Sequence, residues 1–74
     1  MKVIFDSEAD TLSIILRDEE IAESDEIKEG VIIDYSREGK IVSIEIVDAS
    51  EQITGPKGIS YELKGEKRIS AWVS

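Results

Sequence analysis

The sequence predicts a mainly β fold, a small antiparallel β-meander of five to seven strands with at most one short helix; an α+β arrangement is the alternative. Three observations support this prediction. Apolar side chains recur at every second position in several short runs, these runs are rich in β-branched residues, and glycine-containing turns separate them. Such alternation is typical of strands that bury one face.

The expected strands follow one another along the chain. Residues 2–5 and 11–17 make the first pair, residues 30–36 and 40–48 make the second, and residues 58–73 form a C-terminal β-hairpin. Residues 18–29, of which seven are acidic, predict an acidic edge strand or a loop. Charge on an edge strand discourages pairing with other chains.

Two glycine-containing turns constrain how these strands pair. Gly39 and Gly65 are placed to adopt positive φ between two apolar runs. In the C-terminal hairpin, a loop at residues 64–66 would pair Tyr61 with Ile69 and keep the apolar residues on one face. We therefore expect this register.

Acidic residues of the second strand pair, and of the segment after it, have structural interpretations. Asp48 is placed to cap a single helical turn in residues 48–53, with Glu51 three positions later as in a capping box. A short loop after residue 35 would set Asp34 and Glu45 too far apart along their strands for a catalytic pair, whose carboxyl groups lie about 5–10 Å apart. We expect both side chains to be solvated.

The composition limits the chemistry that this protein can perform. Its 74 residues include no cysteine and no histidine, so disulfides are impossible and only hard cations with oxygen ligands could bind. Residues 1–74 form one domain, whose core is marginal at this length, so self-association is the support that we expect.

The charge and the apolar segments limit the partners. A net charge of −8 argues against nucleic acid and anionic membranes and favours a basic protein partner. We find neither a signal-peptide pattern nor an apolar run long enough to span a membrane. We therefore expect a cytoplasmic protein.

Alternating carboxylates at Asp6, Glu8 and Asp10 raise the question of a metal site. Counted from Asp6, an EF-hand loop requires glycine at the sixth position and a bidentate glutamate at the twelfth, where this chain has Thr11 and Arg17. We expect instead a structural turn closed by hydrogen bonds from the backbone to side chains, with no metal and no cofactor.

Two segments resemble the signature motifs of a known family. FDSEADTLSI occupies residues 5–14, and GVIIDYSREGKIVSIEIVDAS occupies residues 30–50. Over residues 3–53 the chain resembles a small prokaryotic family known as domain of unknown function 2283. No activity is established for that family, so the resemblance implies no catalytic residue. It does imply an antitoxin-like role, because members can be encoded beside small toxin-like proteins.

The residues themselves indicate no catalytic site. A serine nucleophile would lack a histidine base, and no glycine-rich phosphate-binding motif is present. We expect a non-catalytic, homodimeric interaction module, an antitoxin-like partner of a small basic protein. The alternative is a hard-metal protein or a small enzyme that uses Asp6, Glu8 and Asp10.

Five apolar residues lie off the main apolar parity of their strands, which makes them candidates for a dimer interface. A sheet surface in contact with water should not collect several isoleucines and the only tryptophan of the chain. Full burial of one isoleucine contributes roughly 1.5–3 kcal/mol, so covering the whole set would add substantially to stability. The expected interface consists of Ile4, Ile15, Ile32, Ile41 and Trp72.

Overall fold

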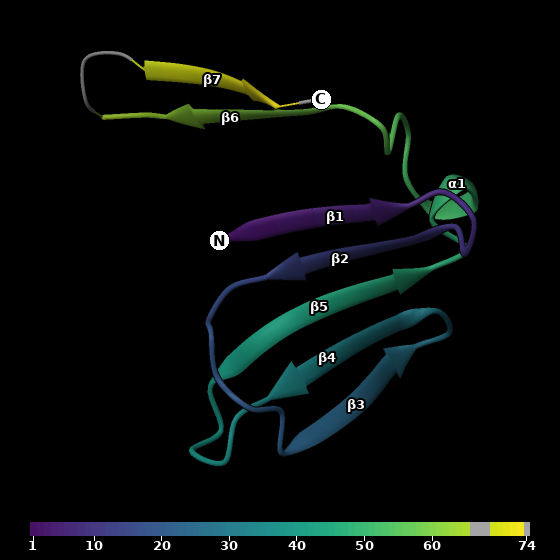
Figure 1. Cartoon of the computed structure of the whole chain (residues 1–74), viewed down its shortest axis with the longest axis vertical. Coiled ribbons are helices and arrows are strands. Elements are labelled where there is room, and N and C mark those ends of the chain that lie inside the picture. The colour runs from purple at the N-terminus through teal and green to yellow at the C-terminus, as the bar shows by residue number, and fades with distance from the viewer. Residues whose placement is uncertain (66–68, 74) are drawn as a thin grey trace.

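An antiparallel five-stranded sheet forms most of the protein (Figure 1). The computed structural model describes residues 1–65 and, for the backbone, residues 69–73. The sheet contains β1 (Lys2–Asp6), β2 (Thr11–Ile15), β3 (Glu23–Lys28), β4 (Val31–Tyr35) and β5 (Ile41–Val47). The single turn of helix α1 (Ala49–Gln52) follows, and β6 (Ile59–Leu63) and β7 (Ile69–Val73) pair as a separate two-stranded sheet. The expected mainly β, antiparallel fold with one short helix is confirmed.

The strand order in the large sheet, β1-β2-β5-β4-β3, departs from a simple meander. After the β1–β2 hairpin, residues 16–22 run past the sheet to its far edge, from which β3, β4 and β5 return to pair with β2 (Figure 1). Strands β2 to β5 therefore form a Greek key. Alternation identifies strands without fixing their neighbours, so the observed order corrects the meander.

The acidic segment supplies the edge strand, as expected. All six residues of β3 are exposed, including Ile27 at 56%. Its outer edge carries no strand among the described residues. The prediction of an acidic edge strand or loop over residues 18–29 is confirmed, because the residues before β3 form a loop.

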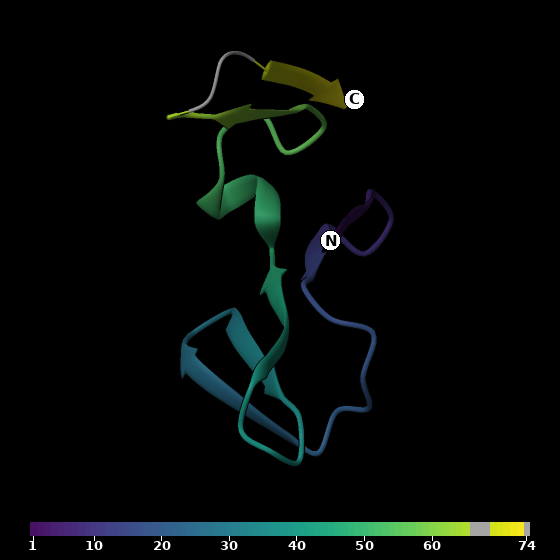
Figure 2. The same cartoon turned by 90° about the vertical axis from the view of Figure 1, so that its left-hand side faces the viewer.

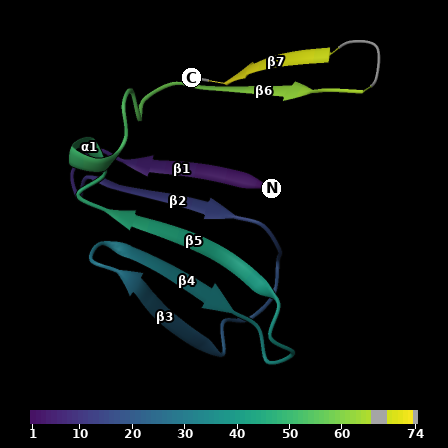
Figure 3. The same cartoon turned by 180° about the vertical axis from the view of Figure 1, so that it is seen from behind.

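The strand register divides the side chains of the large sheet between two faces, because cross-strand partners point the same way. We call one face the apolar face; it carries Val3, Phe5, Leu12, Ile14, Val31, Ile33, Ile44 and Ile46. We call the other the mixed face; it carries Ile4, Ile15 and Ile32 among Ser13, Ser24, Asp34, Ser43 and Glu45. Seen from the front and from behind, no described helix or strand lies over either face (Figures 1 and 3).

The two turn glycines behave as expected, but the C-terminal register does not. Gly39 and Gly65 have φ values of 85° and 91°. Tyr61 pairs with Ala71 rather than with Ile69, which pairs with Leu63, so the loop is longer than the three residues expected. A register shift of two leaves every side chain on its own face, so alternation alone cannot distinguish the two pairings.

Within the part of the chain that the structure describes, the longest helix has four residues, and none is long and apolar enough to cross a membrane.

Candidate functional site

The opening loop is a hydrogen-bonded turn. The backbone N–H groups of Glu8 and Ala9 donate to Asp6 Oδ1 at 3.0 and 3.2 Å. The Asp6 side chain thereby closes the turn between β1 and β2, as the sequence predicted. Glu8 is exposed at its tip.

Asp10 has a different role: it holds the start of α1. The Ala49 N–H donates to the Asp10 carbonyl oxygen at 2.8 Å, and Ser50 donates to the Asp10 carboxylate through its N–H at 3.1 Å and its hydroxyl at 2.6 Å. The expected cap at Asp48 is wrong. Asp48 has φ 55° and makes no capping hydrogen bond through its side chain, whereas a capping residue needs extended backbone angles.

The three alternating carboxylates therefore do not converge on one point. The Asp6 carboxylate accepts hydrogen bonds within the turn, and the Asp10 carboxylate accepts hydrogen bonds from the start of α1. A bound cation would have to replace these hydrogen bonds. Among the described residues, no group of three or more acidic, histidine or cysteine side chains is placed to hold a metal ion.

Gly30 lies where the chain turns from β3 into β4, beside α1. Its φ is 81°, and its carbonyl oxygen accepts the Val47 N–H at 2.8 Å. The Gln52 side chain donates to the Val47 carbonyl at 2.9 Å, and a Cβ on Gly30 would lie 2.6 Å from that amide nitrogen. The positive φ is therefore the main reason for glycine here, and a side chain would in addition displace the flexible end of Gln52.

A buried carboxylate forms the centre of the mixed face. Asp34 is 1% exposed. Its two oxygens accept hydrogen bonds from Ser24 Oγ and Ser43 Oγ, each at 2.6 Å. Ser24 and Ser43 are its direct cross-strand partners on β3 and β5, so three neighbouring strands build this row.

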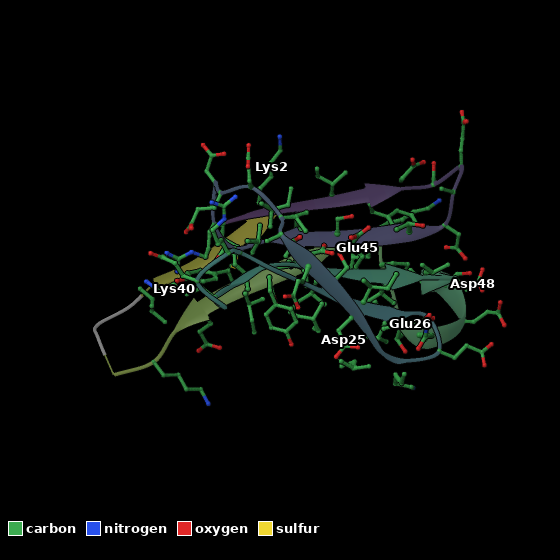
Figure 4. All side chains as sticks on the ribbon, turned by 90° about the horizontal axis from the view of Figure 1, so that it is seen from below. Lys2, Asp25, Glu26, Lys40, Glu45 and Asp48 are labelled. Carbon is green, nitrogen blue, oxygen red and sulfur yellow. The ribbon has the colours of Figure 1, made fainter. Side chains whose placement is uncertain are left out.

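Glu45 also reaches Asp34, which overturns the expected separation of these residues. Tyr35 pairs with Ile41, and a β-bulge then brings Ser43 opposite Asp34. Glu45 is two residues further along β5, on the same face and diagonal to Asp34, within reach of a long side chain. Figure 4 shows Glu45 over the middle of the sheet, whereas Asp25 and Glu26 lie along β3.

The two carboxyl groups titrate in opposite directions. Burial alone would raise the pKa of Asp34, but hydrogen bonds from Glu45, Ser24 and Ser43 outweigh it and hold that pKa below its ordinary value of 3.8. The hydrogen bond to Asp34 is the largest cause that raises the pKa of Glu45 above its ordinary value of 4.5; burial and the Asp34 charge act in the same direction. The pair thus favours an ionised Asp34 beside a protonated Glu45.

These pKa shifts make the contribution of the pair to folding stability largest at acidic pH. The contribution of Asp34 to stability is present above pH 3.8 and is lost as the pH falls through the lowered pKa of Asp34. The contribution of Glu45 is complete below pH 4.5 and is lost as the pH rises through the raised pKa of Glu45. The pair therefore stabilises the fold most near pH 4, and its contribution declines toward neutral pH.

The chemistry of this cluster is structural. Both Asp34 oxygens already accept hydrogen bonds, and the side chain is not accessible to a substrate. Ser24 and Ser43 were not predicted as partners of Asp34. The available signal was that Ser43 and Asp34 interrupt otherwise apolar strands, where a buried polar group needs a partner.

The expected interface residues do not all lie together. Ile4, at 41% exposure, and the half-buried Ile15 and Ile32 share the mixed face. Ile41 pairs with Tyr35 on the far side of the bulge, and the Trp72 side chain lies outside the described residues. The interface itself stays a prediction.

The fold is that of a small, single-layered antiparallel β protein. Among the described residues, Asp34 is the only buried carboxylate, and its role is structural. The chain belongs to the family described as "Protein of unknown function (DUF2283)", whose family model matches residues 2–50. This confirms the resemblance seen in the sequence. No curated protein and no solved structure matches the chain.

Proposed function

We propose that this protein is a non-catalytic, homodimeric interaction module that binds a small basic protein, as an antitoxin-like partner does. The observation that supports the homodimer is the uncovered sheet. Of the eight residues of the apolar face only Ile33 is buried, and the other seven are half-buried. Domains normally bury such a face beneath a second layer, and a second copy would provide it.

The charge distribution supports a basic partner. Residues 1–54 contain 15 acidic and 5 basic side chains. Glu23, Asp25 and Glu26 are exposed on the edge strand β3. Figure 4 shows Asp25 and Glu26 along this strand. Complementary charge would accelerate association and select the partner, more than it would add affinity.

The homodimer is tested by light scattering across micromolar concentrations. We expect a mass of twice the 8.2 kDa chain, and a mass of one chain would refute the proposal. The variant Ile4→Asp reports on the mixed face, since Ile4 is 41% exposed and its replacement leaves the apolar face intact. Dissociation of this variant would assign the interface to the mixed face, and a retained dimer would assign it to the apolar face.

The partner is tested by affinity capture from the native cell at low and high salt. We expect a small basic protein that is released as the Debye length falls below about 10 Å. An acidic partner, or retention that does not respond to salt, would contradict the proposal.

A further inference from the structure

The chain is more open than a compact monomer of its size. Its accessible surface is 5811 Å² for 8.2 kDa, whereas a compact protein of that mass exposes about 4,500 Å². Its radius of gyration is 13.8 Å, against about 11 Å expected for a compact chain of this length. The excess, about 1,300 Å² per chain, exceeds the roughly 800 Å² that each partner buries in a standard interface.

The C-terminal arm, which we define as residues 55–65 and 69–73, is one open part of the structure. Strands β6 and β7 contact chiefly each other, and Figures 1 and 2 show them standing apart from the large sheet, beyond β1. A two-stranded hairpin alone is marginally stable at best in water. Only the start of the arm, residues 56–59, shares a hollow with Val3 and Phe5 of its own sheet. The rest of the arm therefore needs a packing surface that its own chain does not supply in this arrangement.

One side of the arm is apolar and exposed. Ile59, Tyr61 and Leu63 alternate along β6 and so share a face, with exposures of 39, 47 and 37%. The apolar face of the large sheet likewise lacks a cover among the described strands and helix. When two copies associate, the apolar row of one arm can be buried against the apolar face of the other copy.

Charge favours a second copy as the occupant of the apolar face. Residues 55–74 contain four basic and two acidic side chains, whereas residues 1–54 carry a net charge of −10. The register places Asp25 and Glu23 on β3 at the end of the apolar rows, opposite Ile33 and Tyr35. That edge of the sheet is remote from the chain's own arm, which lies beyond β1 (Figure 3).

We propose that the C-terminal arm is exchanged between two copies of this chain, with Ile59, Tyr61 and Leu63 of each copy packed on the apolar face of the other. This inference rests on the proposed homodimer and specifies how it is built. Gly55, with φ 64°, and Pro56 provide the connection from which the arm extends. Exchange by a two-fold axis covers both apolar faces with one repeated contact.

The first experiment compares Tyr61→Asp with Ser60→Asp by light scattering. Both variants add one negative charge to an exposed position of β6, on opposite faces of the strand. We expect Tyr61→Asp to weaken dimerisation at least 100-fold and Ser60→Asp to remain dimeric. A wild-type monomer would refute both the homodimer and the exchange. A dimer that persists in Tyr61→Asp would refute the exchange alone.

The second experiment does not depend on a destabilising variant. A nitroxide attached at Ser60→Cys, the only cysteine of that chain, is placed on unlabelled protein and mixed with ¹⁵N-labelled wild type. We expect broadening of amide signals from β4 and β5 in the ¹⁵N-labelled copy. A second sample carries the nitroxide on the ¹⁵N-labelled chain itself. Unchanged signals in the first sample, together with broadening of β4 and β5 in the second, would mean that the arm folds onto its own sheet, and would overturn the exchange even if the dimer persists.

Discussion

Replacing Asp34 with alanine should remove more stability than any other single carboxylate change in the sheet. The substitution deletes the acceptor of two serine hydroxyls and of the Glu45 carboxyl group. It leaves the Ser43 hydroxyl, which is 6% exposed, without its acceptor. A buried polar group left unpaired costs its full desolvation free energy.

The magnitude follows from these contacts. A hydrogen bond to a charged group contributes about 1.5–3 kcal/mol, and an unpaired buried hydroxyl costs about 1–3 kcal/mol. Relief of the raised pKa of Glu45 returns part of this, so we expect a loss of about 3–5 kcal/mol for Asp34→Ala. Asp34→Asn keeps the shape and one acceptor, and should lose less. A chain of this length has roughly 4–11 kcal/mol of total stability.

Urea unfolding followed by circular dichroism, at one fixed protein concentration, measures these losses. Asp18→Ala is the matched control, because Asp18 is an exposed aspartate outside the strands; it should change the free energy of unfolding by no more than about 0.5 kcal/mol. If Asp34→Ala unfolds within about 1 kcal/mol of the wild type, the cluster does not hold the three strands together and the reasoning is wrong.

Three further predictions concern the other carboxylates. Glu45→Gln should stabilise the protein at pH 7 and flatten the decline in melting temperature above pH 4.5, because an amide donates to Asp34 without ionising; the same gain in the exposed control Glu38→Gln would mean that net charge alone is responsible. Asp10→Ala should lower the free energy of unfolding by about 1–2 kcal/mol through loss of the cap on α1, measured in urea; an equal loss in the loop control Asp18→Ala would contradict this. Millimolar Ca²⁺ should not change the melting temperature of wild type or of Glu8→Gln, and a rise of several degrees that only the wild type displays would restore the metal-site alternative.

Much of the local structure could be predicted from the amino-acid sequence. Alternation located the strands, and the acidic content of residues 18–29 identified an edge segment, because a strand that pairs on one side only tolerates charge along its length. The turn at Asp6 was predictable as well, since a short side chain two or three residues away can bond the backbone without help from the rest of the fold. These features depend on residues close together in the chain.

Tertiary structure alone decided what depends on neighbours distant in sequence. The strand order places β2 beside β5, and no periodicity encodes that choice. A β-bulge brings Ser43 opposite Asp34 and so places Glu45 within reach of Asp34. The bulge adds one residue to β5, and the alternation of apolar residues does not reveal such an insertion. Asp10, 40 residues from Ser50 in sequence, holds the start of α1, whereas the side chain of the nearer Asp48 makes no capping hydrogen bond. In each case the energy resides in a contact between segments that only the folded chain brings together.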